Sequence, residues 1–290
     1  MATVNTRKLA RAMLAPSVVI LFVWMIVPLV LTLWYSFQTY NLLNPINSGF
    51  AGLSNYTYFL TDPSFFEAFR NTLILTVSVL AITVIGGILL ALLLDHEIFG
   101  QGIVRILIIS PFFIMPTVAA LVWKNMLMDP NYGIFAFIAT RLGFAPIAWL
   151  QDYPLFSVIL IVAWQWLPFA TLIIFTALQS LDEEQKEAAG MDGADFLRLF
   201  IYITLPHLAR AITVVILIET IFLLGVFAEI LVTTGGGPGY ASTNIAYLVY
   251  HVALLDYDVG GASAGGMVAV VLANIVAFFL VRIVGKNLNA

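Results

Sequence analysis

The chain has 290 residues, of which 62% are hydrophobic and only 10% are charged, and its mean hydropathy is +1.02. A soluble domain has about 45–50% apolar residues, so this composition indicates a membrane protein. The absence of cysteine excludes disulfides, thiolate metal sites and cysteine nucleophiles. The formal net charge of −4 says little, because the distribution of charge matters more than its total in a membrane protein.

Six segments are apolar over roughly the 20 residues that a bilayer-spanning helix requires. They predict transmembrane helices over residues 15–37, 72–94, 103–123, 155–178, 209–232 and 262–284. The first segment is too long for the core of a signal peptide and lacks a clear cleavage site, so we expect it to be retained. Pro16 and Pro28 interrupt it. We predict an all-α membrane protein in which residues 1–290 form a single transmembrane domain.

The basic residues predict the orientation. With both termini in the cytoplasm, nine of them fall in inner loops and three in outer loops, as the positive-inside rule requires. The inner set is Arg7, Lys8, Arg11, Arg105, Lys186, Arg198, Arg210, Arg282 and Lys286, and the outer set is Arg70, Lys124 and Arg141. We therefore expect both termini, and the segment 180–206, to be cytoplasmic.

No motif favours an enzyme or a metal site. The histidines, His96, His207 and His251, lie in three separate loops, and the sequence has no zinc-site or GxSxG motif. The glycine-rich TTGGGPGY suggests a phosphate cradle, but no GKS or GKT follows it, so a flexible outer turn is the better interpretation. The loops are also too short to hold a nucleotide-hydrolysing domain.

Charged residues are concentrated in the segment SLDEEQKEAAGMDGADFLRLFIYITLP, residues 180–206. Ser180 and Glu183 have the spacing of a capping box, and the acids around Glu183 favour a helix N-terminus. Gly193 is free to adopt a positive φ and is expected to end this helix. Asp195 and Arg198 are spaced for an i,i+3 ion pair in a second helix that stops at Pro206. A solvated loop is the simpler interpretation, but two helices and a glycine turn in so short a segment favour a docking surface for a partner.

The same segment carries a family resemblance. Glu187-Ala188-Ala189, three further residues, Gly193, nine further residues and then Ile203-x-Leu205-Pro206 resemble the EAA motif of ABC importer permease subunits. The outer stretches FAGLSNYTYFLTDPSFFEAFRNTLILT and TTGGGPGYASTNIAYLVY are similar to those of carbohydrate-type permeases, including the maltose type. The resemblance covers most of the chain and implies the type I ABC importer permease fold in a bacterial inner membrane.

The resemblance also implies the partners. They are a second homologous permease, a homodimer of cytoplasmic ABC ATPases that bind the ATP, an external substrate-binding protein and the lipid bilayer. The permease itself then needs no cofactor and no nucleic acid. In such importers the EAA helix, or coupling helix, inserts into a cleft on the ATPase, and here the residues implied are Glu187, Ala188, Ala189, Asp192 and Gly193. We also expect the first span to lie outside the five-helix core and to pack around the partner permease.

Two predicted spans carry candidate substrate groups. Glu219 lies in the middle of the fifth, where an acid is costly and is by default a functional candidate, although a hydrogen bond to a neighbouring helix is the alternative. No Lys or Arg lies at comparable depth, so we expect Glu219 to face a water-filled cavity. In the fourth span, AWQWLPF places Trp164, Gln165, Trp166 and Phe169 near mid-membrane, where aromatic faces suit sugars and polyols but also suit plain packing.

The resemblance extends to the cargo. The positions at which maltose-type permeases contact sugar correspond to Val162, Trp166, Phe169, Glu219, Phe222, Leu223 and Val226. Several of these lack the polar groups of the maltose-type pattern, and GGGPGYAST resembles sorbitol and mannitol permeases, so we expect a small polyol or sugar. The alternatives are an ABC permease for a non-carbohydrate solute, such as an amino acid or phosphate, and an ion-coupled secondary transporter, which is expected to show internal repeats that are not found here.

Overall fold

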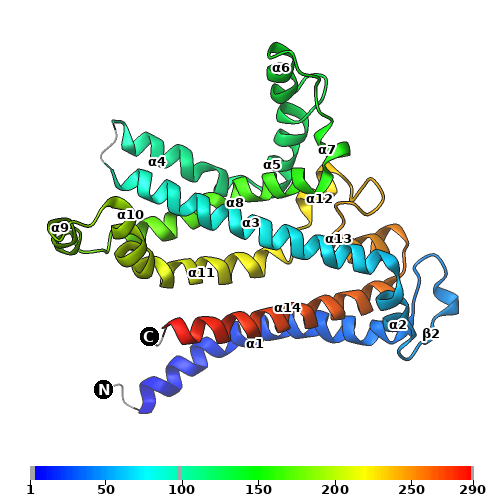
Figure 1. Cartoon of the computed structure of the whole chain (residues 1–290). Coiled ribbons are helices and arrows are strands. Elements are labelled where there is room, and N and C mark those ends of the chain that lie inside the picture. The colour runs from blue at the N-terminus through cyan, green and yellow to red at the C-terminus, as the bar shows by residue number, and fades with distance from the viewer. Residues whose placement is uncertain (1–3, 97–98, 289–290) are drawn as a thin grey trace. The chain divides into compact units, whose positions relative to one another are not determined.

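A computed structural model of the chain describes residues 4–96 and 99–288, which are mostly helical (Figure 1). The long helices are α1 (Val4–Ser36), α3 (Pro63–Asp95), α8 (Pro154–Leu178), α11 (Leu205–Leu223) and α14 (Val259–Leu288). The shorter α-helices are α2 (Ser54–Thr61), α4 (Gln101–Ile109), α5 (Pro116–Val122), α6 (Ile134–Arg141), α7 (Trp149–Asp152), α9 (Glu183–Met191), α10 (Phe196–Leu199), α12 (Ala228–Thr233) and α13 (Ile245–Tyr250).

The remaining elements are short. Two are 3₁₀ turns, η1 (Pro45–Asn47) and η2 (Ser110–Phe113), and three are π-helical turns, η3 (Trp123–Leu127), η4 (Phe200–Thr204) and η5 (His251–Leu255). The strands β1 (Gln38–Thr39) and β2 (Gly49–Phe50) form an antiparallel pair in which Gln38 lies opposite Phe50.

Within the described residues, five helical segments are long and apolar enough to cross a membrane, or six when one bent pair is taken as a single span. The third predicted span, 103–123, is this pair: residues Gln101–Phe113 and Pro116–Leu127 are bent by 107°. The bend precedes Pro116, which has no N–H to continue the ladder of the preceding helix. The fifth predicted span, 209–232, is also broken, since α11 ends at Leu223 and α12 begins at Ala228.

The chain divides into two compact units, each described separately below. The first comprises residues 1–62 and 249–271. In it, α1 continues through both Pro16 and Pro28 rather than being interrupted by them. The Asn55 side chain ties the hairpin to the end of α1 by donating to the carbonyl oxygens of Ser36 and Gln38, at 3.0 and 2.8 Å. The single domain predicted over residues 1–290 stays a prediction.

The second unit comprises residues 63–248 and 272–290 and carries both candidate sites. Its helices α3, α8 and α11 lie side by side (Figure 1). They share a core of buried aliphatic side chains and Phe175. Gly87 permits the close approach of α3 to α8, because a Cβ atom there would lie 3.0 Å from the Cβ of Ala170. Asn71 on α3 also donates to the carbonyl oxygens of Tyr240 and Thr243, so the glycine-rich segment predicted to be flexible is fastened to α3.

Candidate functional site

The segment between α8 and α11 folds as a helical loop, but its first helix begins later than predicted. Asp182 is the N-cap of α9 and accepts a hydrogen bond of 3.1 Å from the backbone N–H of Glu184. The capping box predicted at Ser180 is wrong. The Ser180 hydroxyl instead donates to the carbonyl oxygen of Ala177 at the end of α8, at 2.7 Å, and lies 3.0 Å from Nε2 of His207 on α11.

The glycine turn forms as predicted. Gly193 has a φ of +79°, which a residue with a side chain adopts only with strain. Asp195 then caps α10 by accepting a hydrogen bond of 2.9 Å from the N–H of Arg198, and the predicted ion pair between the two is present at 4.0 Å. The second helix does not stop at Pro206: the π-helical turn η4 leads directly into α11, and Pro206 is the second residue of α11. Residues 196–223 are therefore helical without a break.

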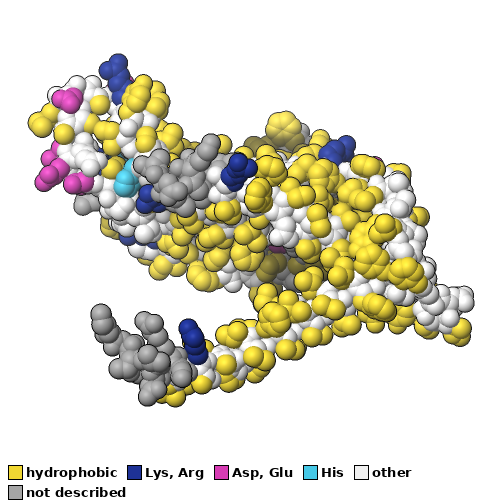
Figure 2. All heavy atoms as spheres, turned by 90° about the horizontal axis from the view of Figure 1, so that it is seen from below, with side chains coloured by type: hydrophobic (Ala, Val, Ile, Leu, Met, Phe, Trp, Pro, Cys, Tyr) yellow, Lys and Arg dark blue, Asp and Glu magenta, His cyan; other side chains and the backbone are white. Residues whose placement is uncertain are grey.

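The loop presents the predicted docking residues to solvent. Glu187, Ala188, Asp192 and Gly193 are exposed and Ala189 is half-buried. The apolar side chains that lie beside them are also exposed: Met191 by 85%, Phe196 by 67%, Leu197 by 60% and Tyr202 by 75%. Figure 2 shows acidic side chains gathered around the end of the molecule that carries α9, next to hydrophobic ones. Exposed apolar side chains that lie together beside small and acidic residues are typical of a protein interaction site.

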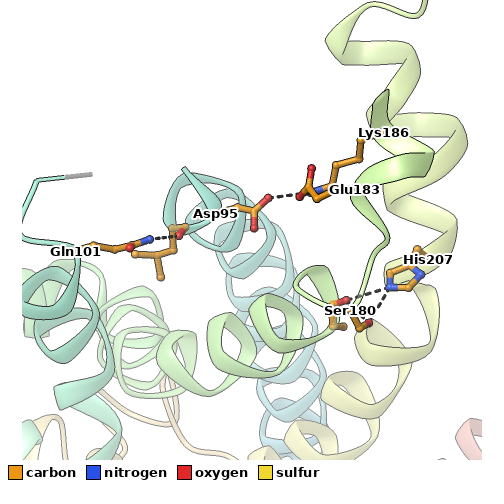
Figure 3. Close-up of polar contacts among 8 residues, drawn as sticks. Asp95, Gln101, Ser180, Glu183, Lys186 and His207 are labelled. Carbon is orange, nitrogen blue, oxygen red and sulfur yellow. Dashed lines mark hydrogen bonds and ion pairs between the residues drawn. The ribbon is translucent and has the colours of Figure 1, made fainter. Parts of the chain in front are cut away.

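Polar contacts hold the loop against neighbouring helices (Figure 3). Nζ of Lys186 on α9 lies 3.3 Å from Oδ2 of Asp95 at the end of α3 and 2.9 Å from Oε1 of Glu183. Burial lowers the pKa of Lys186, but hydrogen bonds and attraction from Glu183 and Asp95 outweigh it and leave the pKa raised above its ordinary value. Beside these contacts, Gln101 donates to the carbonyl oxygen of Leu94 at 2.7 Å and joins α4 to α3.

The candidate substrate residues in the membrane do not converge on one cavity. Glu219 is completely buried, and its Oε2 accepts a hydrogen bond of 2.6 Å from Oγ1 of Thr83 on α3. Its Oε1 is also buried and has no hydrogen-bond partner in the described part of the chain. The expectation that Glu219 faces a water-filled cavity is therefore wrong for this structure, because a hydroxyl on the adjacent helix occupies the place expected for water. A role in substrate binding stays a prediction.

Gln165 and Val226 lie at the two helix breaks. Nε2 of Gln165 donates to the carbonyl oxygen of Ile114, at the bend of the third span, at 3.3 Å. The carbonyl oxygen of Val226, between α11 and α12, accepts a 2.6 Å hydrogen bond from Nδ2 of Asn244. Non-helical backbone at membrane depth is tolerated where protein groups satisfy it, so these two amides explain how both spans are interrupted. Val162 and Leu223 are fully buried in packing.

The aromatic candidates do come together. Trp166 lies 5.1 Å from Phe222 and 5.8 Å from Phe169 between ring centroids. The analysis of the sequence missed a fourth ring, Phe112 in η2, which stacks on Phe169 at 5.7 Å. The run SPFF in the third span was the only available signal. Phe222 is 59% exposed and the tryptophan is half-buried, so the cluster presents an aromatic face to whatever lies beside α11.

Together these features define a multi-span membrane protein with an exposed helical docking loop. Residues 102–290 match the family described as "Binding-protein-dependent transport system inner membrane component", and the chain belongs to this family. It is accordingly a multi-pass component of an inner-membrane transport system and not an enzyme.

Individual relatives agree. The chain is 38% identical to a probable ABC transporter permease of Sinorhizobium fredii, over 88% of this chain and 83% of the relative. It is 32% identical to the trehalose/maltose transport system permease MalF of Thermococcus litoralis, over 88% and 87%. It is 30% identical to the sulfoquinovosyl glycerol transport system permease SmoG of Agrobacterium fabrum, over 96% and 91%.

Solved structures share the fold. The crystal structure of a bacterial ABC transporter involved in the import of the acidic polysaccharide alginate superposes with a TM-score of 0.83 at 22% identity, over 98% of this chain and 97% of that one. An amino acid ABC transporter superposes with a TM-score of 0.53 at 17% identity, over 81% and 95%. The type I ABC importer permease fold expected from the EAA resemblance is thereby confirmed.

Proposed function

We propose that this chain is the permease subunit of an ATP-driven, binding-protein-dependent importer for a sugar or polyol. The observation that carries the proposal is the exposed loop α9–Gly193–α10, which is capped at both helix starts and continuous with α11. Such a loop is a rigid lever between a cytoplasmic motor and the membrane. Its partners in this proposal are a second homologous permease, a homodimer of cytoplasmic ATPases that binds the ATP, and an external substrate-binding protein.

The mechanism follows from the continuity of the helices. Closure of the ATPase pair on ATP moves α9, and the helix from Phe196 to Leu223 carries that displacement into the membrane without a flexible joint. The permeases then change from inward-facing to outward-facing while the binding protein delivers its cargo. Both termini are cytoplasmic in this arrangement. Ion-coupled secondary transport receives no support from a chain that belongs to a binding-protein-dependent family.

Several observations support a carbohydrate-like cargo. Relatives named for trehalose and maltose and for sulfoquinovosyl glycerol align over most of the chain. The rings of Trp166 and Phe222 offer the flat apolar surface that the carbon face of a sugar or polyol needs. Within this class we favour a small polyol such as sorbitol or mannitol, because the buried Val162, Leu223 and Val226 supply no polar side chain to a larger sugar.

The structure is compatible with a neutral and with an anionic cargo. The carboxyl group of Glu219 is buried against Thr83, so it is not available to repel an anionic cargo in this structure. A relative named for sn-glycerol-3-phosphate is 30% identical over 87% of this chain. The ligand screen therefore has to include anionic polyol phosphates beside neutral polyols.

Two measurements test the proposal. The permease should copurify in detergent with its cognate ATPase, and the binding protein should stimulate ATP hydrolysis by the complex. A thermal-shift screen of the cognate binding protein with mannitol, sorbitol, maltose, trehalose, glycerol-3-phosphate and histidine should give its largest shift with a polyol or sugar. A response to histidine alone would overturn the carbohydrate assignment, and absence of the ATPase from the purified complex would overturn the importer mechanism.

A further inference from the structure

The coupling helix α9 has little packing of its own. None of its described residues is buried, and a cavity of about 310 Å³ lies behind it. Its lining includes Asp95 at the end of α3 and Glu183 and Lys186 on α9. A helix that sits over a cavity cannot transmit a push through van der Waals contact alone, because the space behind it is free to be filled when it moves.

One ion pair crosses this cavity. Lys186 on α9 reaches Asp95, the last residue of α3, with Nζ and Oδ2 at 3.3 Å (Figure 3). The two side chains are only 19% and 29% exposed, whereas Glu183, the other partner of Lys186, is 76% exposed. Solvent therefore screens the contact between the two helices less than the contact within α9.

Helix α3, which carries Asp95, is connected to the other long helices of the second unit. α3 packs along α8, with Gly87 against Ala170, and it holds Glu219 of α11 through Thr83. Thr83 lies twelve residues before Asp95 on the same unbroken helix, so a displacement applied to Asp95 reaches the middle of the membrane without crossing a loop. The covalent route from α9, by contrast, passes through the turn at Gly193.

We propose that the Lys186–Asp95 ion pair is a strut through which the coupling helix drives α3, in parallel with the covalent connection from α9 to α11. This inference rests on the proposed function, since it presupposes that α9 is moved by an ATPase. Lys186 and Asp95 are positioning residues: they contact neither cargo nor ATP, and they fix the distance between α9 and α3.

The first test measures that distance. The chain has no cysteine, so spin labels can be placed at Met191→Cys on α9 and Leu93→Cys on α3, both exposed, in the complete transporter reconstituted in nanodiscs. The strut predicts a narrow distance distribution whose centre is unchanged between the nucleotide-free and the ATP–vanadate states. Asp95→Asn should broaden it, and a distribution in the unmodified pair that shifts between the two states would overturn the proposal.

The second test measures coupling as the ratio of ATP hydrolysis with the binding protein to hydrolysis without it. Asp95→Asn and Lys186→Gln should each lower this ratio by about threefold, the scale of one partly screened ion pair, and the double variant should be no worse than either. Glu183→Gln is the matched control, because it removes the negative charge from the contact within α9 and keeps the ion pair to α3, and its ratio should stay unchanged.

A covalent crosslink between positions 95 and 186 distinguishes loss of the connection between α9 and α3 from a general effect of the substitutions on folding. The pair Asp95→Cys with Lys186→Cys should lose coupling, and a short flexible bis-thiosulfonate linker between the two thiols should restore it. If Asp95→Asn and Lys186→Gln couple normally while Glu187→Lys uncouples, the strut is wrong and the proposed function stands. If Glu187→Lys also couples normally, docking through α9 fails, and the strut fails with it.

Discussion

Oγ1 of Thr83 donates a hydrogen bond of 2.6 Å to Oε2 of Glu219 and so joins α3 to α11 inside the second unit. A carboxyl group at the centre of a bilayer-spanning helix costs about 2.5–3.5 kcal/mol on insertion scales, so it persists only when it is hydrated or paired. Here it is paired. The hydroxyl of Thr83 thus holds in place the acid that the sequence marks as the most unusual residue of the spans.

This pairing makes Thr83 a stability determinant. Thr83→Val keeps the shape of the side chain and removes the donor, which leaves a buried carboxyl group without a partner and should lower the free energy of unfolding by about 1–3 kcal/mol. Thermal unfolding of the purified permease in detergent measures this. Thr171→Val is the control, because the buried Thr171 hydroxyl donates only to Leu167 within its own helix, and this variant should be nearly neutral. Equal effects of the two changes would contradict the account.

The two ways of changing Glu219 should differ. Glu219→Gln keeps an amide oxygen that accepts from Thr83, whereas Glu219→Ala removes this contact between helices and opens a void, leaving the Thr83 hydroxyl only the carbonyl oxygen of Leu80 at 3.3 Å. We therefore expect Ala to lower stability and uptake more than Gln. Uptake of the ligand identified on the binding protein, measured in proteoliposomes, reports the second effect. If Gln lowers uptake as strongly as Ala while stability is kept, the carboxylate acts directly on the cargo.

The exposed ring of Phe222 should matter for transport and not for folding. Phe222→Ala removes the ring that lies 5.1 Å from Trp166 and should weaken transport of a polyol or sugar by the equivalent of about 0.5–1.5 kcal/mol, with assembly unchanged. Ile221 is equally exposed and has no part in the aromatic cluster, so Ile221→Ala is the matched control. Similar uptake by both variants would show that the aromatic face is packing.

Substitution of Gly193 tests whether the turn between α9 and α10 is needed to couple ATP hydrolysis to the binding protein. Gly193→Ala forces a side chain into a φ of +79° and should cost about 1–2 kcal/mol, bending α9 away from its docking position and lowering stimulation of ATP hydrolysis by the binding protein. Gly143 has a φ of +82° with open space around it, so Gly143→Ala introduces the same strain outside the loop. We expect Gly143→Ala to couple normally, and the reverse outcome would rule out a special role for the turn.

The first span carries its own prediction. Met25 in the middle of α1 is 71% exposed, and no residue in the most apolar window of this helix is buried in the described chain. Met25→Cys should therefore form thiol crosslinks to the partner permease in the assembled transporter. Crosslinks confined to spans of the same chain would contradict packing of α1 around the partner.

The sequence predicts those features that depend on local chemistry. Apolar length alone predicts six spans, and the described residues hold five long apolar helices, or six segments with the bent pair. A single glycine located the turn at residue 193, where φ is positive. The misplaced cap is instructive: Ser180 has the correct spacing to Glu183, but Asp182 lies closer to the helix start and takes the role. When a segment holds two residues that can cap a helix, here Ser180 and Asp182, the spacing to the following glutamate does not decide which of them is used.

The features that the sequence did not predict depend on contacts between distant segments. Thr83 and Glu219 are 136 residues apart, and Asp95 and Lys186 are 91 apart, so no local pattern connects them. The helix breaks were missed for the same reason. Gln165 and Asn244 stabilise the interrupted backbone from other parts of the chain, and hydropathy alone records only that the broken spans are apolar.

Crosslinking from the loop tests most directly the claim that residues 180–206 dock on the ATPase. In the assembled transporter, Met191→Cys on the exposed surface of α9 should form a thiol crosslink to the ATPase, whereas Tyr132→Cys, which is 91% exposed in the loop between η3 and α6, should not. Crosslinking of the ATPase at residue 132 and its absence at residue 191 would contradict both the orientation of the chain and the role of the loop.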